Sequence, residues 1–561
     1  MSQFLAFERI FSHSMFVDLD VLPDLWCEVC IVGAGPVGLA LGLSLASKGV
    51  RTLMVESGGD RPRKRSRDVS ALASYNDDHH HSSEATVVRA LGGTSLRWGG
   101  RCVEFDDIDF EPRDYVSEGG WPIPHSALKP YYGAARKVLT ADFSENFQSG
   151  ENLVFARSRE SWARIRNVAR ANYHALRDNR SLMICKNCTA TQMHVDADSA
   201  RLMALTCVAR RKARLITAPF FVFAGGGREN TRLLLELQLQ KARLFGGAGG
   251  PLGRFYMGHL AGEIASISFA RTSNAAPFLF RVSQTKTVIR DRLQPTAGIQ
   301  REHGLLNITL GPDSLRPDEV IGGNGAASLF LVARHIARRA RDPVFRNSIS
   351  VREAFNAHLR NILAHPMQAA YGSSRLLAGK LLTPERYPQF SIPSPTNTYL
   401  LRYHAEQTPL WESRIKLSNQ KDANGCHRLD VDFRYSHNDF HSVVKAHYLL
   451  SEWLGRNSIG HLTFLKPADA LEEWVGSQAI DGYHQLGLTR MSRSRQTGIV
   501  DGDCQVHDIP NLFIAGSSVF PTSSQANPTL AAVAMSLRLA DHLASRVSVQ
   551  RRHVELGVNR D

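Results

Sequence analysis

The order of apolar and polar positions near the N-terminus predicts a strand–helix–strand unit. Residues 27–32 form a short apolar run that leads into the glycine-rich turn 33–38, and residues 39–48 continue as an apolar stretch of helical length. A second apolar run, residues 51–55, closes on Glu56. Strand, helix and strand in this order are typical of a βαβ unit in a doubly wound parallel sheet.

Similar strand-to-turn patterns occur much later in the chain. Residues 220–223 are four consecutive apolar residues before a second glycine turn, and a helical run begins near residue 231. Residues 511–517 show the same strand-to-glycine pattern, and a long helical run covers residues 530–543. Elements of a nucleotide-binding sheet are therefore predicted at both ends of the sequence, with unrelated sequence between them.

The sequence between these ends predicts a second, mixed fold. Residues 331–365 and 438–456 have helical periodicity, and residues 428–434 alternate like a strand. No internal repeat of 20–50 residues is present. We therefore expect an α/β fold, in which a Rossmann-like, doubly wound domain is interleaved with an α+β domain built on a mainly antiparallel sheet.

The first glycine turn has the GxGxxG spacing of a dinucleotide site. Gly33 permits the tight turn, Gly35 lets the backbone approach a pyrophosphate, and Gly38 allows close packing of helix on strand. The helix N-terminus offers free N–H groups and a positive dipole end to the phosphates. Glu56 is placed to accept hydrogen bonds from a ribose diol. These residues predict a dinucleotide but do not separate FAD from NAD.

The remaining glycine-rich segments lead to a family. Residues 92–100 hold four glycines around Trp98, which suggests backbone pressed against a flat group. Together with the second glycine turn and the segment 527–529, they resemble the glucose–methanol–choline (GMC) oxidoreductases, in particular the sugar-oxidising, pyranose oxidase-like members. The resemblance covers residues 27–59, 91–139, 216–260 and 481–545, and in the middle mainly residues 405–407 and 413–418. It implies an FAD cofactor.

The resemblance also implies two catalytic residues, His484 in the block 484–491 and Asn527 in the block 527–529, which in the family face the flavin together. An alcohol C–H becomes a useful hydride donor only when its O–H proton is leaving, so a base must lie within hydrogen-bond reach. Neutral His484 suits this role because the ordinary imidazole pKa is about 6.5. Asn527 would donate its amide N–H to the developing alkoxide and hold the carbinol over flavin N5.

The candidate cofactor-binding residues fall in the two glycine turns, the end of the second strand, the Trp98 segment and the C-terminal segments. They are Gly33, Gly35, Pro36, Val37, Gly38, Glu56, Ser57, Gly92, Gly93, Thr94, Arg97, Trp98, Gly99, Gly100, Ala224, Gly225, Gly226, Gly516, Ser517, Asn527, Pro528 and Thr529.

Two positions depart from the family pattern. Relatives with covalently bound flavin carry a histidine in the Trp-containing loop, whereas Arg97 precedes Trp98 here, so we expect noncovalent FAD. Gly258 stands where relatives often have an acidic residue.

Two other motifs are interpreted as structural. Cys185 and Cys188 have CxxC spacing, but no second pair completes a metal site, so we interpret them as structural thiols. The three histidines 79–81 follow a polar stretch and are interpreted as a loop, and His507 and His542 lack the context of His484. No metal site is predicted.

The resemblance divides the chain into interleaved domains. A discontinuous FAD-binding domain is expected from residues 22–130, 195–260 and 480–545, and a substrate-binding domain from residues 131–194 and 261–479. Residues 1–14 and 546–561 are expected to be terminal extensions, the latter a loose tail.

Composition and charge add little that changes this interpretation. The chain has 561 residues, 43% apolar and 21% charged, as in ordinary globular proteins. Its net charge of +14 would suit a nucleic acid or an anionic surface, but no nucleic-acid motif is present, and we interpret the chain as a mildly basic enzyme. Eight cysteines are too few for a disulfide scaffold.

The sequence shows neither a signal peptide nor an apolar run long enough to span a membrane. We expect a soluble cytoplasmic protein, with weak membrane association through the basic, amphipathic residues 331–341 left open.

The predicted function is FAD-dependent oxidation of a CH–OH group of a sugar, glycoside or related alcohol to a carbonyl, by hydride transfer to flavin N5 with His484 as general base. Two alternatives stay open: a different flavin reaction on the same scaffold (monooxygenation or elimination), or a flavin subunit that needs a partner for turnover. The sequence does not determine the electron acceptor, which could be oxygen, a quinone or a protein. Substrate regiochemistry and oligomeric state are also open.

Overall fold

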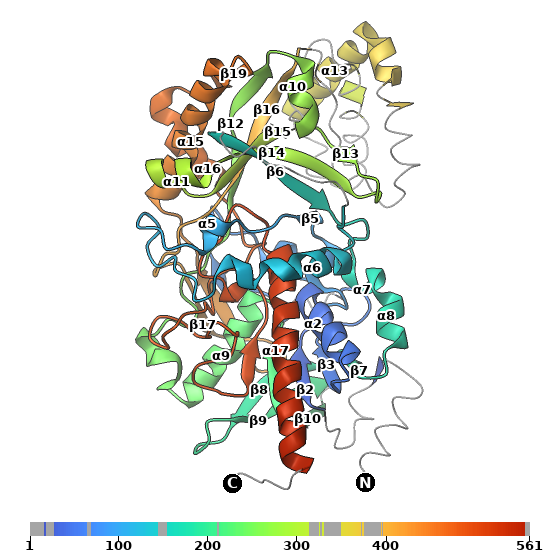
Figure 1. Ribbon diagram of the computed structural model, residues 1–561, viewed down its shortest axis with the longest axis vertical. Coiled ribbons are helices and arrows are strands. Elements are labelled where there is room, and N and C mark those ends of the chain that lie inside the picture. Colours follow the sequence, from blue (N-terminus) through green and yellow to red (C-terminus); the bar gives the residue numbers. More distant parts are fainter. Residues whose placement is uncertain are drawn as a thin grey trace.

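The computed structural model describes residues 16–17, 27–63, 69–143, 154–209, 212–313, 349–371 and 396–555, with isolated positions between 325 and 394. In the view of Figure 1 a parallel sheet with its helices forms the lower part, and an antiparallel sheet with its helices forms the upper part. The predicted fold class, a doubly wound domain interleaved with a mainly antiparallel one, is confirmed.

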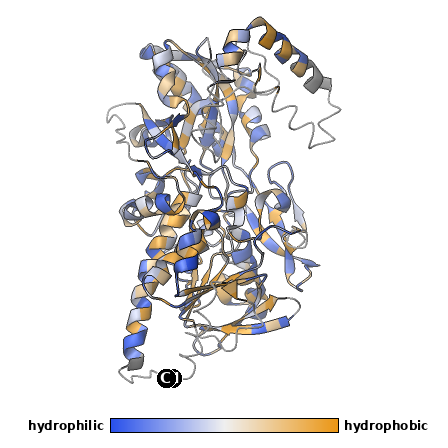
Figure 2. Ribbon diagram, turned by 90° about the vertical axis from the view of Figure 1, so that its right-hand side faces the viewer, coloured by the Kyte–Doolittle hydropathy of each residue, from blue (hydrophilic) through white to orange (hydrophobic). Residues whose placement is uncertain are grey.

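The lower part is built on a six-stranded sheet in the order β1-β7-β3-β2-β11-β20, and every pair in it is parallel. The four strands β2, β3, β11 and β20 are buried at every position, as near-continuous apolar runs in parallel sheets usually are. The strand bounds are β1 Phe16–Val17, β2 Val29–Val32, β3 Thr52–Glu56, β7 Leu182–Lys186, β11 Phe220–Phe223 and β20 Leu512–Ile514. Figure 2 shows hydrophobic strands gathered in this part of the molecule.

The three longest helices of the lower part are α2 (Pro36–Ser47), α9 (Gly227–Gln240) and α17 (Thr529–Glu555). Helices α2 and α17 pack against each other, and α17 runs along the lower part in Figure 1. Helix α2 lacks a side-chain cap at Gly35 and has Pro36 in its first turn, so its N-terminal N–H groups stay available to a ligand.

The upper part is an antiparallel sheet in the order β19-β12-β16-β15-β14-β6-β5, with β13 added beside β14. Helices α15 (His437–Arg456) and α16 (Leu471–Gln478) pack against β12, and with the sheet they enclose a second apolar core. The strand bounds are β5 Arg101–Cys102, β6 Phe155–Trp162, β12 Leu260–Phe269, β13 Arg281–Val282, β14 Val288–Pro295, β15 Ile308–Asp313, β16 Thr398–Ala405 and β19 Gly460–Phe464.

Two three-stranded sheets and several short helices complete the described chain. The first sheet is β8 Thr189–Val195, β9 Leu202–Ala209 and β10 Lys212–Thr217; the second is β4 Ser74–Tyr75, β17 Arg414–Lys421 and β18 His427–Asp432. The helices are α4 Ser83–Thr86, α5 Asp107–Phe110, α6 Tyr132–Val138, α7 Val168–Ala171, α8 Tyr173–Asp178, α10 Thr272–Ala275, α11 Ala297–His303 and α13 Ile349–Ala364.

The structure departs from the predicted domain boundaries at three places. Strand β7, inside the range 131–194 assigned to the substrate domain, belongs to the parallel sheet, because it is largely buried and pairs in parallel with β1 on one side and β3 on the other. Strand β5, inside the range 22–130, pairs instead with β6 of the antiparallel sheet. The expected tail from residue 546 is also helical as far as Glu555, because Val547 is buried and Arg551 forms an ion pair with Glu28.

The other sequence motifs lie as follows. All eight cysteines, Cys185 and Cys188 included, are buried, and none of them forms a disulfide. His80, in the run 79–81, is buried and hydrogen-bonded to the hydroxyl of Tyr256. The basic stretch 331–341 lies outside the described residues apart from Val332, as do residues 1–14. Within the described ranges, no helix has the length and apolar character needed to cross a bilayer.

Candidate active site

A long cleft lies at the carboxyl ends of the parallel strands. Its empty space, including the part open to solvent, is about 1270 Å³. One end is lined by the turn after β2 and by Glu56 at the end of β3, and the other end by His484. Open α/β sheets bind their ligands in this place, outside the carboxyl ends of the strands.

The first glycine turn forms the floor of this cleft. Gly33 has φ +109°, and a Cβ there would lie 2.6 Å from the carbonyl oxygen of Ala224, so only glycine fits. A Cβ on Gly38 would lie 2.0 Å from the carbonyl oxygen of Gly33, which reflects the close packing of helix on strand. A Cβ on Gly35 would meet nothing within 4 Å, although Gly35 lines the cleft. The turn therefore leaves open the space that a pyrophosphate would occupy above the uncapped start of α2.

Glu56 is held at the end of β3 by backbone donors. Its Oε2 accepts from the N–H of Ala34 at 2.9 Å and its Oε1 from the N–H of Gly58 at 2.7 Å. Burial raises the pKa of Glu56, and the backbone N–H groups oppose that shift. A carboxylate can accept about four hydrogen bonds, so Glu56 keeps acceptor capacity for a ribose diol. The residues present at this end fit a dinucleotide.

At the other end of the cleft, His484 and Asn527 are in contact. The side-chain amide Nδ2 of Asn527 lies 2.8 Å from Nε2 of His484, although the two residues are 43 positions apart in sequence. Oδ1 of Asn527 accepts from Nη1 of Arg101 at 2.6 Å. Because that oxygen is taken by a guanidinium, the amide must present its N–H to His484. The two residues that the sequence singled out as catalytic are thus brought together.

Neighbouring groups set the tautomer of His484. Its Nδ1 lies 2.9 Å from Oδ2 of Asp481 and 3.0 Å from Nδ1 of His259. His259 donates from Nε2 to the carbonyl oxygen of Ser523 at 3.1 Å, so its Nδ1 is an acceptor. Nδ1 of His484 therefore carries the proton, and Nε2 presents a lone pair beside Asn527.

Two further histidines surround this pair and are kept neutral. Burial lowers the pKa of His259 to about 3, and burial beside Arg101 lowers the pKa of His404 far below its usual range. His259, His404 and His484 bring one ring nitrogen each within 4.8 Å of one another, a spacing that could hold a metal ion. Since Nδ1 of His484 carries a proton directed at Asp481, we interpret the cluster as hydrogen-bonded rather than metal-binding.

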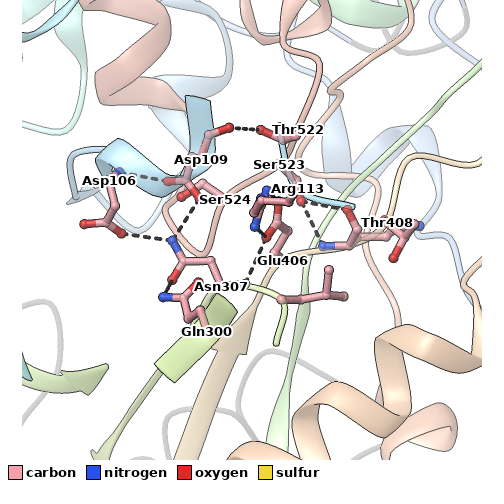
Figure 3. Close-up of polar contacts among 12 residues, drawn as sticks. Asp106, Asp109, Arg113, Gln300, Asn307, Glu406, Thr408, Thr522, Ser523 and Ser524 are labelled. Carbon is pink, nitrogen blue, oxygen red and sulfur yellow. Dashed lines mark hydrogen bonds and ion pairs between the residues drawn. The ribbon is translucent and has the colours of Figure 1, made fainter. Parts of the chain in front are cut away.

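A strained turn holds these histidines in place. Ser524 has φ +57°. The carbonyl oxygen before it, of Ser523, accepts from Nε2 of His259, and the carbonyl oxygen after it, of Gln525, accepts from Nδ1 of His404 at 2.5 Å. A non-glycine residue with positive φ is a strained feature that surrounding contacts must stabilise. Figure 3 shows another contact of the same segment: Thr522 donates to the carbonyl oxygen of Asp109 at 3.1 Å.

The same buried polar network ties the turn to the antiparallel sheet. Arg113 and Glu406 form a bidentate ion pair at 2.7 and 2.6 Å, and Glu406 also accepts from the backbone N–H of Asn307. The side chain of Asn307 donates to Asp109 at 2.9 Å. The network therefore links strands β15 and β16 to the segment that positions His259 and His404.

Most of the predicted cofactor-binding residues line the cleft. They are Gly33, Gly35, Pro36, Val37, Glu56, Ser57, Gly93, Thr94, Ala224, Gly225, Gly226, Gly516, Ser517, Pro528 and Thr529, together with the catalytic candidate His484. Seven do not line it: Gly38, Gly92, Arg97, Trp98, Gly99, Gly100 and Asn527. Trp98 donates instead to the carbonyl oxygen of Arg166, and Arg97 to that of Glu84. Asn527 is connected to the cleft by its contact with His484, which does line it.

The sequence analysis missed several residues of the site. Tyr483 and Gln485 flank His484 and line the cleft, and Gln485 accepts from the backbone N–H of Arg228 at 3.0 Å. Their position beside His484 is a signal that could have found them. Arg101 and His259 had no such signal, because their contacts with the pair join distant segments, and the contact of Asp481 with His484 exists only once the loop 481–484 has folded.

Comparisons with known proteins agree with this architecture. Residues 409–536 match the family described as "GMC oxidoreductase", and residues 26–68 match the family described as "FAD binding domain". These matches confirm the resemblance to the GMC oxidoreductases and the predicted FAD cofactor.

Curated relatives share parts of the sequence. A C-glycoside 3-oxidase of Arthrobacter globiformis is 39% identical over 142 residues, which is 24% of this chain and 25% of the relative. A pyranose 2-oxidase of Tricholoma matsutake is 33% identical over 66 residues, which is 12% of each chain. The chain thus matches a quarter or less of the length of these relatives.

Solved structures share the fold over almost the whole chain. A pyridoxine 4-oxidase from Mesorbium loti has a TM-score of 0.50 at 16% identity and covers 92% of this chain and 99% of its own. A fungal aryl-alcohol oxidase has a TM-score of 0.52 at 12% identity and covers 94% of this chain and 100% of its own. At these identities the likeness is one of fold.

Proposed function

With the GMC oxidoreductase match as the premise, we propose that this chain is an FAD-dependent oxidoreductase that oxidises a CH–OH group of a sugar, glycoside or related alcohol to a carbonyl. The observation that carries the proposal is the contact of His484 with Asn527 at the end of the cleft, with Nε2 of His484 unprotonated. C-glycoside 3-oxidase and pyranose 2-oxidase among the relatives support the substrate class.

His484, Asn527 and Arg101 have different roles in the proposed alcohol oxidation. Bound FAD supplies the hydride acceptor. The substrate hydroxyl donates its proton to Nε2 of His484, in the place now taken by the amide of Asn527. That amide, held by Arg101, is then free to donate to the developing alkoxide oxygen. General-base help of this kind is worth about 10²–10⁴-fold in rate.

Three finer statements belong to the same proposal. FAD is bound noncovalently, since Arg97 is exposed and stands where a covalent link would need a histidine. The electron acceptor is oxygen, a quinone or a protein. The protein is cytoplasmic, which is supported by eight cysteines that form no disulfide, because disulfides are rare in that compartment.

An anaerobic screen tests the proposal directly. Purified enzyme is mixed with sugars, glycosides and simple alcohols, and loss of the oxidised flavin absorbance is followed by stopped flow. At least one polyol should bleach the flavin without NADPH or a partner protein. Bleaching by NADPH alone would favour monooxygenation, and bleaching only with an added protein would favour the subunit alternative.

His484→Ala should keep its flavin but reduce it at least about 10²-fold more slowly. His507→Ala is the matched control, because His507 contacts the carbonyl oxygen of Ser492 and does not line the cleft. If His484→Ala is reduced at the rate of the control, His484 is not the base.

A further inference from the structure

Four hydrogen-bond donors converge on the buried carboxylate of Asp481. Its Oδ1 accepts from the backbone N–H groups of Tyr483 at 2.9 Å and His484 at 3.3 Å. Its Oδ2 accepts from the backbone N–H of His259 at 2.8 Å and from Nδ1 of His484 at 2.9 Å. One side chain therefore fixes the backbone of both histidine segments and the ring of His484.

The charge of Asp481 is retained despite its burial. Burial alone would raise the pKa of this carboxyl, but the ring of His484, His259 and the backbone donors hold the pKa well below its usual range. Asp481 as a whole residue is 4% exposed, so this is a resident negative charge in a low-dielectric site.

We infer that Asp481 is a positioning residue that holds His484 in its Nδ1–H tautomer and stabilises the imidazolium formed when Nε2 accepts the substrate proton. The inference rests on the proposed function, in which His484 is the base. In that step the O–H bond of the substrate breaks, an Nε2–H bond forms, and the positive charge on the ring lies 2.9 Å from the carboxylate.

Only an acceptor-only group satisfies this position. An asparagine at position 481 would have an NH₂ group in place of one of the two carboxylate oxygens. In one orientation the NH₂ would face the backbone N–H groups of Tyr483 and His484, and in the other it would face the backbone N–H of His259. At least one donor would be left facing another donor. An amide NH₂ facing Nδ1 of His484 would also draw the ring into the opposite tautomer, with the proton on Nε2.

The glycine at position 258 is the other half of this arrangement. A Cβ on Gly258 would lie 2.7 Å from both Cβ and Oδ2 of Asp481. The space beside the peptide of residue 258 is thus filled by the carboxylate of Asp481, which comes from a distant segment. A side chain at position 258 would therefore collide with the carboxylate that orients His484.

The test compares Asp481→Asn with wild type and with Asp439→Asn. Asp439 is the matched control, because it is also a buried carboxylate that accepts backbone N–H groups, from Thr408 and Ser436, away from His484. Asp481→Asn should keep its FAD but lose about 10²–10⁴-fold in the rate constant of flavin reduction. Asp439→Asn should stay within about threefold of wild type.

A second readout does not depend on activity. In protein labelled with ¹⁵N-histidine, with the His484 signals assigned from His484→Gln, wild type should show the proton on Nδ1 and Asp481→Asn should show it on Nε2. A wild type that fails to reduce its flavin with any alcohol would refute the proposed function, while the tautomer would still test this inference.

The exchange variant Gly258→Asp/Asp481→Gly decides the matter if Asp481→Asn fails to fold. It should reduce its flavin at least about tenfold faster than Asp481→Gly alone, whereas Gly258→Asp alone should be impaired by the collision with Asp481. A folded exchange variant that is no faster than Asp481→Gly, or an Asp481→Asn that keeps the wild-type rate or tautomer, overturns the inference.

Discussion

Replacing Gly35 with valine should weaken FAD binding by orders of magnitude and leave the fold intact. Gly35 has φ −76° and ψ −176°, a region that valine adopts readily. The new Cβ would meet no protein atom within 4 Å, so the apoprotein has no reason to unfold. The side chain would instead extend into the cleft at the start of α2, where a pyrophosphate would bind.

The expected loss of FAD affinity follows from two free-energy costs, both of which affect cofactor binding and not folding. Forcing extra carbon atoms into an occupied space costs about 1–3 kcal/mol, and losing one charge-assisted hydrogen bond from the helix N-terminus costs about 1.5–3 kcal/mol. Together they weaken binding by about 3–6 kcal/mol, which is about 10²–10⁴-fold in Kd.

The assay is a titration of apoprotein with FAD, followed by quenching of flavin fluorescence, with thermal unfolding recorded in parallel. Gly35→Val should purify colourless and melt within a few degrees of wild-type apoprotein. Gly38→Val is the contrasting variant: its Cβ would lie 2.0 Å from the carbonyl oxygen of Gly33, so it should fail to fold. A yellow Gly35→Val whose Kd is within tenfold of wild type would refute the assignment of this turn to the pyrophosphate.

Two further predictions concern the cofactor link and the buried acids. Acid precipitation of the holoenzyme should release all yellow colour into the supernatant, and colour retained in the pellet would contradict noncovalent FAD. Burial, together with the charges of Asp106 and Glu406, raises the pKa of Asp109 to about 8. The folded state then binds more protons than the unfolded chain between about pH 4 and pH 8, so the free energy of unfolding should fall as the pH rises through that window, by at most about 1.4 kcal/mol per pH unit from this group. Asp109→Asn should show a flatter pH profile of melting temperature than wild type, and parallel profiles would remove Asp109 as the cause.

The sequence predicted the parts of the fold whose signals are local. The strand β11 was predicted at its observed bounds, and β2, α2 and β3 within a few residues, because glycine turns mark their ends. Strand β7 was missed because nothing local assigns the apolar run Leu182–Lys186 to one sheet rather than another. Its place follows only from pairing with β1 and β3, which are distant in sequence.

The same limit applies to the site. His484 and Asn527 were found because each stands in a recognisable block, and their roles stay a prediction that the structure makes geometrically possible. Arg101, His259 and Asp481 have no local motif. Each acts on the pair through a contact that spans many residues or, for Asp481, through a side-chain bond at i+3 that only the folded loop creates.

The late position of β20 and Asn527 in the sequence has a consequence for biosynthesis. Strand β20 and the segment that carries Asn527 come after residue 510, yet β20 pairs with β11 and Asn527 meets His484 and Arg101. A ribosome must therefore translate more than nine-tenths of this sequence, and the newly made segment must leave its exit tunnel, before the flavin cleft can close. Until then β11 has an unpaired edge, and a nascent chain stalled before residue 512 would expose it to chaperones and to other chains.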